Sequence, residues 1–352
     1  MTTCVSANYS RGELFISSIE NRGPNVKKVT RRGFFQSAGI AAAVPVFGAI
    51  AAEAQQPAAP DPNVERDVVY GKGGDMELHL DIYRPPAGVA AKLMAVIHIH
   101  GGGFTAGSKT GVASSSRAFA GLGYVSIASQ YRLAGQGKWP AQIEDAKAAI
   151  RWTRANASKL GIDADKIAIA GYSAGGLMAL VAAGTADKPE FEGNGGNAGV
   201  SSKVAACASF YAATGATANL FPDGTDRAVV AAAGAANFIS PTFAPTIFLH
   251  GLGDTTIRPD SSIDFFQKLR AAGVKVDLHL FQGAPHAFET NNPDAALVSA
   301  QAANLFFDRL ILNPKEYPPF GGGGGRGGAR GAGAGAPGGA GGARGTGRGG
   351  PQ

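Results

Sequence analysis

The stretch Lys166-Ile-Ala-Ile-Ala-Gly-Tyr-Ser-Ala-Gly-Gly-Leu177 is the part of the sequence that decides the fold. Its first five residues form a run of the kind that is buried inside a parallel sheet. An apolar helical pattern follows over residues 174–184. Gly171 and Gly175 flank the junction and allow the backbone to turn sharply without a side-chain clash. The stretch therefore predicts a strand, a tight turn and a helix, with Ser173 raised above the strand end at the positive end of the helix.

Strand-like and helix-like segments alternate on both sides of this stretch. The expected strands span residues 67–70, 77–83, 93–99, 123–129, 166–170, 204–210, 245–250 and 275–281. The expected helices span residues 111–121, 141–160, 174–184, 260–272 and 293–311. This alternation after an antiparallel start predicts an α/β fold, with a mostly parallel eight-stranded sheet covered by helices on both faces.

Charge is distributed unevenly along the 352 residues. Of the net charge of +6, the first 54 residues carry +3 and the last 32 carry +4, which leaves −1 for the middle of the chain. A nearly neutral middle argues against a nucleic-acid-binding surface there. The two cysteines, Cys4 and Cys207, are too few for a disulfide framework and have no metal-ligand spacing.

A second glycine motif, His100-Gly-Gly-Gly-Phe104, follows the expected strand at 93–99. Three consecutive glycines expose backbone N–H groups in a loop at the end of a strand. In acyl transfer, such groups and the N–H of Ala174 stabilise the oxyanion that forms when a serine attacks a carbonyl. A plain glycine turn is the alternative interpretation. The presence of both motifs, about 70 residues apart, favours a nucleophilic Ser173.

A nucleophilic serine needs a base, and the base needs an acid that orients it. His286 lies in a loop after the last expected strand, and Asp254 lies in the loop after the strand before it. The chain order Ser173, Asp254, His286 is that of the α/β-hydrolases. His250, which ends a strand, is the competing base. The histidines inside strands are most simply structural, and the competing acids lack a strand-end position: His79, His98 and His279, and Asp223, Asp226 and Asp260.

Four motifs in this order, within about residues 67–312, carry a family resemblance: His-Gly-Gly-Gly-Phe, Gly-Tyr-Ser-Ala-Gly-Gly, His-Gly-x-x-Asp and Gly-x-x-His-x-Phe. They resemble the α/β-hydrolase esterase and lipase superfamily, especially bacterial carboxylesterases near the hormone-sensitive-lipase and acetylxylan/feruloyl esterase groups. The resemblance implies a catalytic triad of Ser173, Asp254 and His286. It also implies that the N–H groups of Gly102, Gly103 and Ala174 form the oxyanion hole.

Two departures from that group bear on the substrate. Tyr172 stands where the lipase-like group often has Asp, and residues 55–66 are too short for its two-helix N-terminal cap. Small side chains dominate the insertion at 211–243 and would grip a long acyl chain weakly, which predicts a preference for short acyl chains. The aromatic residues expected to line the mouth and bind a flat or sugar-like group are Phe104, Tyr172, Trp139 and Phe288.

The N-terminal region has the features of an export signal. Thr30-Arg-Arg-Gly-Phe-Phe-Gln36 precedes an apolar run of 16 residues, Ser37 to Ala52, and an Ala-x-Ala sequence at 52–54. This order resembles a bacterial twin-arginine signal cleaved after residue 54. Because a membrane span needs about 20 residues, we expect a periplasmic or secreted protein with no stable membrane insertion after cleavage. A basic N-terminal helix or an uncleaved anchor is the alternative.

We therefore expect four parts: a signal peptide (1–54), a linker (55–66), an α/β-hydrolase catalytic domain (67–312) and a disordered tail (313–352). Residues 321–352 contain 18 of the 52 glycines and four arginines, with no aromatic or acidic residue, so they have little to bury. Gly/Arg segments can bind RNA. For an exported protein we favour a flexible cationic extension, and we expect no nucleic-acid partner. The sequence leaves the oligomeric state open.

The sequence thus predicts an exported serine carboxylesterase that hydrolyses short-chain, aryl or carbohydrate esters. No metal or organic cofactor is implied, since His98 and His100 form an H-x-H pair without a third ligand. Three alternatives stay open. An amidase of the kynurenine-formamidase type would use the same triad. A lipase would need 211–243 to fold as an apolar lid helix. A non-catalytic hydrolase-fold binding protein would typically lack a triad member.

Overall fold

The computed structural model describes residues 4–10, 13–19, 61–186 and 188–316. The chain divides into two units, Met1–Ala58 and Ala59–Gln352. In the first unit, β1 (Cys4–Ser10) and β2 (Glu13–Ile19) pair in antiparallel fashion, where the sequence analysis expects no strand. The twin-arginine motif, the apolar run, the cleavage site and the Gly/Arg tail lie outside the described residues, so the division into four parts stays a prediction.

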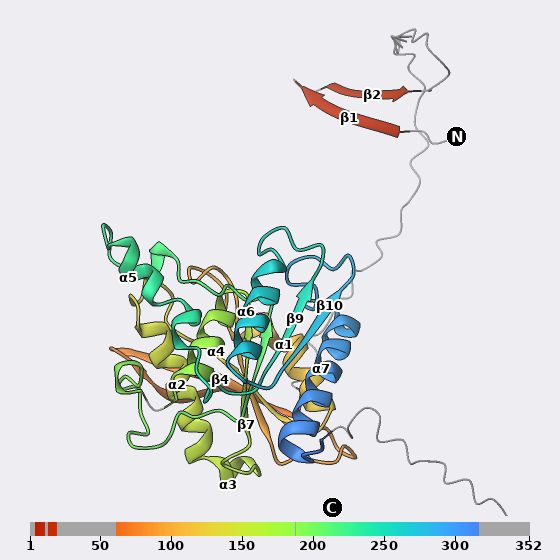
Figure 1. The fold of residues 1–352 in the computed structure, drawn as a ribbon. Coiled ribbons are helices and arrows are strands. Elements are labelled where there is room, and N and C mark those ends of the chain that lie inside the picture. The colour runs from red at the N-terminus through yellow and green to blue at the C-terminus, as the bar shows by residue number, and fades with distance from the viewer. Residues whose placement is uncertain (1–3, 11–12, 20–60, 187, 317–352) are drawn as a thin grey trace, which may run out of the picture. The chain divides into compact units, whose positions relative to one another are not determined.

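An eight-stranded sheet runs through the second unit, in the order β10-β9-β8-β7-β5-β6-β4-β3 (Figure 1). β4 pairs antiparallel with β3 and β6, and all other neighbours are parallel. The predicted mostly parallel sheet is therefore confirmed. The strands are β3 (Val64–Gly73), β4 (Met76–Tyr83), β5 (Ala95–Ile99), β6 (Val125–Ser129), β7 (Ile167–Tyr172), β8 (Ala206–Phe210), β9 (Thr246–Gly251) and β10 (Val276–Phe281).

Helices cover both faces of this sheet. α1 (Ala113–Gly121) and α7 (Pro293–Phe307) pack on one face. The helices on the other face are α2 (Ala141–Ala155), α4 (Ala174–Gly184) and α6 (Asp260–Ala271). Two shorter helices complete the set, α3 (Ala157–Leu160) and α5 (Arg227–Ala232), together with single turns at Lys109–Val112, Pro189–Phe191, Ala218–Leu220, Ala235–Phe238 and Asp308–Leu312.

Two elements differ from their expected bounds. β3 begins at Val64, inside the expected linker, because its pairing with β4 extends a strand whose exposed polar residues hide it in the sequence. The helix expected at 141–160 breaks at Asn156 into α2 and α3. The Asn156 amide donates a hydrogen bond to the Trp152 carbonyl, which is the kind of local contact that competes with a continuous helix.

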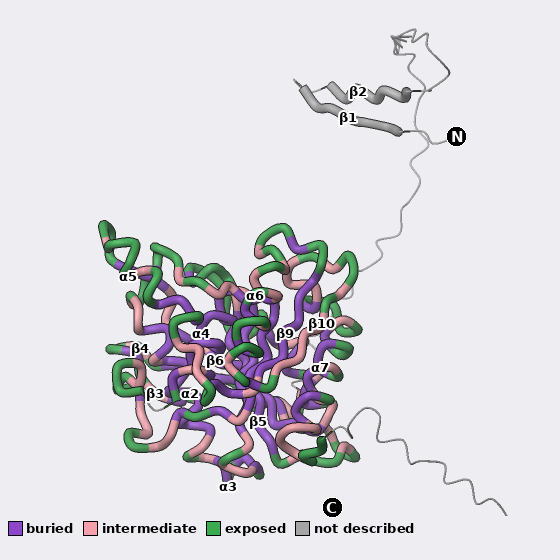
Figure 2. The backbone as a smooth tube through the Cα atoms, in the orientation of Figure 1, coloured by how far each residue is buried: buried purple, intermediate pink, exposed green. Residues whose placement is uncertain are grey.

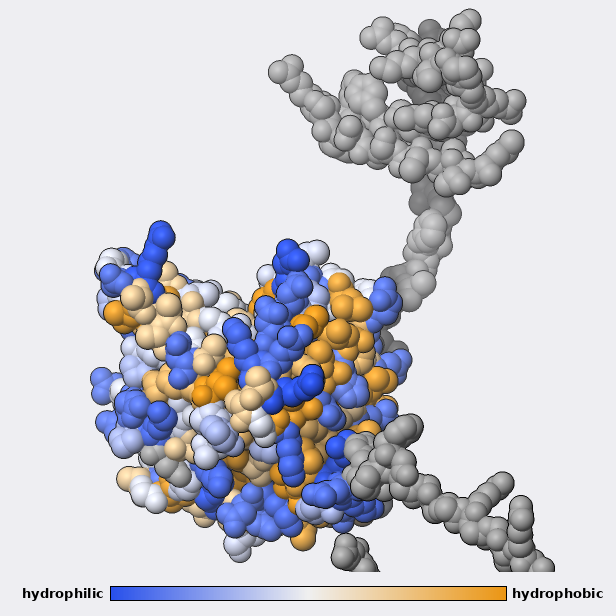
Figure 3. Space-filling model, viewed as in Figure 1, coloured by the Kyte–Doolittle hydropathy of each residue, from blue (hydrophilic) through white to orange (hydrophobic). Residues whose placement is uncertain are grey.

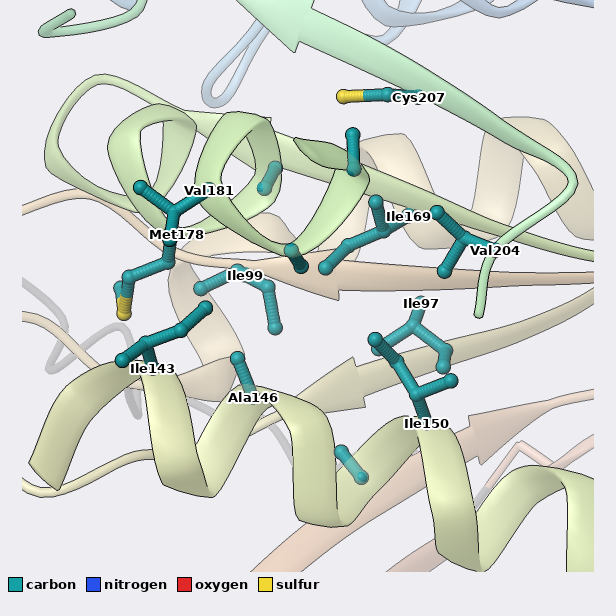
Figure 4. Close-up of a cluster of buried hydrophobic side chains, with 14 of the residues drawn as sticks. Ile97, Ile99, Ile143, Ala146, Ile150, Ile169, Met178, Val181, Val204 and Cys207 are labelled. Carbon is teal, nitrogen blue, oxygen red and sulfur yellow. The ribbon is translucent and has the colours of Figure 1, made fainter. Parts of the chain in front are cut away.

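The side-chain alternation of β5 divides the core between the two faces. Ile97 and Ile99 point to the α2 and α4 side, where they meet Ile143, Ile150 and other apolar side chains (Figure 4). Val96 points to the opposite face, toward the α1 and α7 side. The central strands are consequently buried along their whole length (Figure 2), which holds their carboxyl ends in fixed positions.

Apolar side chains gather on the side of the second unit that carries β10 and α7 (Figure 3). The exposed ones include Leu280, Leu297, Val298 and Leu305. The segment Pro293–Leu312 is long and apolar enough to cross a membrane by composition alone. Its other face packs into the core through Ala300, Ala303, Phe306 and Phe307, as expected for a core helix of a globular fold.

Candidate active site

The groups singled out in the sequence meet at the carboxyl edge of the parallel strands. Ser173 lies between β7 and α4, Asp254 follows β9, and His286 follows β10. The triple-glycine loop follows β5, the neighbour of β7. In open α/β sheets this edge is where binding sites form, because the connections there leave a crevice.

Ser173 occupies a strained turn. Its φ of 54° and ψ of −115° are unusual for a residue with a side chain, and it is the first residue before α4. The two flanking positions must be glycine, because a Cβ at either one would collide with neighbouring backbone atoms. A Cβ on Gly171 would lie 2.3 Å from the Gly175 carbonyl oxygen, and a Cβ on Gly175 would lie 2.1 Å from the Ile99 oxygen. The turn thus brings the serine directly against the loop that follows β5.

The three predicted triad residues lie within hydrogen-bond distance of one another, with His286 between Ser173 and Asp254. His286 Nε2 is 2.9 Å from Ser173 Oγ, and His286 Nδ1 is 2.6 Å from Asp254 Oδ2. Because a carboxylate only accepts, Nδ1 carries the proton and donates to Asp254, which leaves Nε2 to accept from the serine hydroxyl. This arrangement is the one that activates a serine nucleophile.

Asp254 is 5% exposed and is held as a carboxylate. Burial opposes its charge, but the hydrogen bond from His286 and those from the N–H groups of Ile257 and Thr256 outweigh it and keep the pKa of Asp254 below its usual range. His250, the competing base, is fully buried behind this carboxylate. Its Nε2 donates to the Ile257 carbonyl at 2.8 Å and lies 3.2 Å from Asp254 Oδ2, and it makes no hydrogen bond to Ser173.

The triple-glycine loop lies beside Ser173. A Cβ on Gly101 would lie 3.0 Å from the Ser173 Cβ, and Gly102 and Gly103 have φ values of 117° and 61°, which favour glycine. Within residues 61–186 and 188–316, the N–H groups of Gly102, Gly103 and Ala174 donate to no backbone carbonyl. Their availability fits an oxyanion hole, and that role stays a prediction.

Ser173 and His286 open into a cavity of about 610 Å³. Glycines of the loop at 101–107 form much of its wall, and Phe104 and Tyr172 also line it while being 1% and 2% exposed. The Tyr172 hydroxyl hydrogen-bonds to His98 Nδ1 at 2.9 Å. Contact of these two aromatic residues with a substrate stays a prediction.

The other two expected aromatic residues require correction, because neither lines the cavity. Trp139 is partly buried and packs against Phe191 and Phe221, with ring centroids 6.2 and 6.4 Å away, at the edge of the core. Phe288 turns away from the site, since the backbone adopts a positive φ of 56° at Ala287 and the ring packs against Phe281 at 4.8 Å. The direction of a loop side chain could not be read from the sequence.

Two cavity residues escaped the sequence analysis. Tyr211 directly follows β8, and its ring meets the His286 imidazole edge to face at 4.7 Å. Glu289 is buried, and its Oε1 accepts a hydrogen bond from the Tyr211 hydroxyl at 2.5 Å. The available signal was position: Tyr211 follows a buried strand at the same sheet edge, and Glu289 lies three residues after His286.

The model of the BD-FAE family matches residues 80–269. This chain belongs to the BD-FAE family. The matched segment runs from β4 through α6 and includes Ser173 and Asp254, whereas His286 lies beyond it.

Curated relatives are esterases. Esterase LipC of Mycobacterium tuberculosis is 29% identical over 271 residues, which cover 72% of this chain and 66% of the relative. An arylesterase of Saccharolobus solfataricus is 39% identical over 121 residues, which cover 33% of this chain and 39% of the relative. The match thus spans about two thirds of the first relative and well under half of the second.

The match to a solved structure spans nearly the whole of the other protein's chain. Est2, a thermophilic esterase from the Planctomycetes species Thermogutta terrifontis solved with propionate bound, has a TM-score of 0.61 and 30% identity, covering 72% of this chain and 97% of that chain. The same esterase has also been solved phosphorylated by paraoxon. This BD-FAE member is therefore an α/β-hydrolase of the esterase group.

Proposed function

We propose that this protein is a serine carboxylesterase that works through an acyl-enzyme, with Ser173, His286 and Asp254 as its triad. The observation that carries the proposal is the continuous hydrogen-bond chain from Asp254 through His286 to Ser173 at the edge of the cavity. The similarity to proteins named as esterases supports the same reaction class.

In the first half of the reaction, His286 Nε2 takes the Ser173 proton as Oγ attacks the ester carbonyl. Asp254 keeps the proton of Nδ1 in place and stabilises the imidazolium. The N–H groups of Gly102, Gly103 and Ala174 donate hydrogen bonds to the carbonyl oxygen and stabilise the negative charge that forms on it. His286 then returns its proton to the leaving alcohol, and the acyl group stays on Ser173.

In the second half, a water molecule replaces the alcohol. His286 removes its proton as the water attacks the acyl carbonyl, and the same N–H groups stabilise the second oxyanion. Collapse of this intermediate returns the proton to Ser173 and releases the carboxylic acid. Apart from the ester and this water molecule, every group that acts in these steps belongs to the chain.

We propose short-chain or aryl and carbohydrate esters as substrates. The cavity of about 610 Å³ is lined by glycines, by Val112 and Ile257, and by the rings of Phe104, Tyr172 and Tyr211, and α5, in the insertion at 211–243, contributes no residue to its lining. Without a lid helix from that insertion, little further apolar area is available to the far end of a long acyl chain, while the aromatic rings suit a flat partner. The relatives include an arylesterase and an esterase with bound propionate.

Hydrolysis of p-nitrophenyl esters from acetyl to palmitoyl, in parallel with Ser173→Ala, tests the proposal. We expect kcat/KM to peak between acetyl and butyryl, and paraoxon to inactivate the wild type but not the variant. A peak at ten carbons or more, or activation at a lipid–water interface, would establish a lipase instead. Faster cleavage of N-formylkynurenine than of any ester would establish the amidase, and no turnover with no paraoxon labelling would establish a binding protein.

We also propose that residues 1–54 direct export through the twin-arginine pathway, leaving a periplasmic or secreted enzyme. The support is the order of the arginine pair, the apolar run and the Ala-x-Ala sequence. Changing Arg31 and Arg32 together to Lys is expected to retain the precursor in the cytoplasm. Mass spectrometry of the exported wild type is expected to find Gln55 at the N-terminus, and an envelope protein that begins at Met1 would refute cleavage.

A further inference from the structure

Glu289 is a carboxyl group in the wall of the reaction cavity to which the mechanism above gives no task. Among the described residues that line the cavity, it is the only acidic one, and no lysine or arginine lines it. The side chain is 2% exposed. Oε1 accepts from Tyr211, but Oε2 is buried with no hydrogen-bond partner. A half-satisfied buried carboxyl is costly, so its presence in the site requires an explanation.

Direct binding of substrate does not explain it. Because Oε2 is closed off from solvent in the wall, a substrate group in the cavity has no route to it. Glu289 must therefore act through the groups it touches. One of these is Tyr211, which follows β8, two strands away from β10 in the sheet and 78 residues earlier in the chain than Glu289.

Tyr211 connects Glu289 to the base. Its ring meets the His286 imidazole at a centroid distance of 4.7 Å and an interplanar angle of 64°. It also contacts Phe288 at 6.0 Å, so the ring is packed between neighbouring parts of the loop that carries His286. This loop includes the left-handed residue Ala287, and a strained loop depends on such outside contacts to keep one conformation.

The charges around His286 come from four elements. Asp254, after β9, is its hydrogen-bond partner, and His250, in β9, is kept neutral because burial lowers its pKa. Tyr211 follows β8 and Tyr172 ends β7, and burial raises the pKa of both hydroxyls well above their usual range. Glu289, after β10, is the remaining carboxyl: burial raises its pKa, whereas the Tyr211 hydroxyl and the charge of His286 oppose that rise.

We propose that Glu289 is a positioning residue for His286: its carboxylate holds the Tyr211 ring against the imidazole and favours the protonated imidazole that forms during turnover. The inference rests on the proposed function, in which His286 takes the proton of Ser173. A second carboxylate then stabilises the same imidazolium as Asp254, through a ring rather than through a direct hydrogen bond.

Glu289→Gln in the full-length chain tests this, because the amide keeps the shape and an oxygen that accepts from Tyr211 but removes the charge. Losing a nearby negative charge disfavours the imidazolium. The pKa of His286, measured by NMR titration and assigned with His286→Gln, is expected to fall by about half a unit to one unit. The acid limb of kcat/KM is expected to move to lower pH by the same amount, with kcat about three- to tenfold lower and KM little changed.

The matched control is Glu190→Gln, an exposed glutamate that does not line the cavity, for which neither the His286 pKa nor kcat is expected to change. A folded Glu289→Gln enzyme with the wild-type His286 pKa overturns the proposal, even if its melting temperature falls, since that result indicates a structural anchor alone. If Glu289→Gln does not fold, Tyr211→Phe decides. It removes the hydroxyl that helps keep Glu289 charged, so a smaller shift in the same direction is expected and no shift overturns the proposal.

The same experiment separates this inference from the esterase proposal. A wild type that hydrolyses no ester contradicts the proposed function, whereas the NMR titration still measures whether Glu289 acts on His286. An active wild type with unshifted variants contradicts the inference alone.

Discussion

The triad and the cavity wall lie side by side but are built differently. Ser173, Asp254 and His286 each follow the end of a parallel strand within a few residues, and hydrogen bonds hold each of them to another member of the site. The wall comes from loops at 101–112 and 287–290 and from single positions in other loops, where side-chain packing sets the shape. The sheet thus determines where the chemistry occurs, while the loops determine what fits.

The largest expected effect comes from substituting the triad residues. Ser173→Ala and His286→Ala are each expected to lower kcat by roughly four to six orders of magnitude, and Asp254→Ala by somewhat less. Combining the three should cost little more than the worst single change, because the groups act as a unit. Steady-state kinetics with p-nitrophenyl acetate measure this. Near-normal turnover of His286→Ala together with loss in His250→Ala would make His250 the base.

The second prediction concerns the turn that joins the two regions. In Gly175→Ala, the new Cβ would lie 2.1 Å from the Ile99 oxygen and 2.5 Å from the His100 oxygen, both of them backbone atoms that cannot swing away. We expect a loss of at least about 1–3 kcal/mol in the free energy of unfolding, measured by urea denaturation. Gly121→Ala in α1 is the control, since its Cβ meets nothing within 4 Å and stability should stay equal or rise.

The same contrast explains how far the sequence could predict this site. The sequence could predict that Ser173, Asp254 and His286 lie together, because each belongs to a motif that follows a strand and the fold brings these strand ends to one edge. Trp139 and Phe288 were misplaced because the direction of a loop side chain depends on neighbours far away in the chain. Tyr211 and Glu289 were missed for the same reason, since their meeting joins residues 78 positions apart. Likewise, β3 begins at Val64 because this residue pairs with β4, and no local sequence pattern indicates that start.

The third prediction sharpens the comparison within the wall. Phe104→Ala removes a ring that lines the cavity, so it should shift the acyl-chain preference toward longer esters, by about three- to tenfold in the ratio of kcat/KM for hexanoyl over acetyl. Trp139→Ala removes a larger ring that is partly buried against the core and does not line the cavity, so it should lower stability but leave that ratio unchanged. An altered ratio in Trp139→Ala would return this residue to the substrate site.

The last prediction concerns the strand beneath the site and depends on pH. Burial lowers the pKa of His98 to about 3 and of His100 to about 4, so both stay neutral in the folded chain. The His98 ring is already held by Tyr172 and Ser126, and His100 Nδ1 donates to the Gly101 carbonyl, so each ring has a packing role.

In the unfolded chain these histidines take up protons below about pH 6.5, while in the folded chain they do so only near their lowered pKa values. Their contribution is therefore complete above pH 6.5 and is lost as the pH falls toward 4, by at most about 1.4 kcal/mol per pH unit for each ring. Urea denaturation between pH 7 and 4.5 measures this slope. His98→Asn is expected to be less stable at pH 7 yet to lose stability less steeply in acid. An unchanged slope of unfolding free energy against pH would mean that burial does not keep the His98 ring neutral.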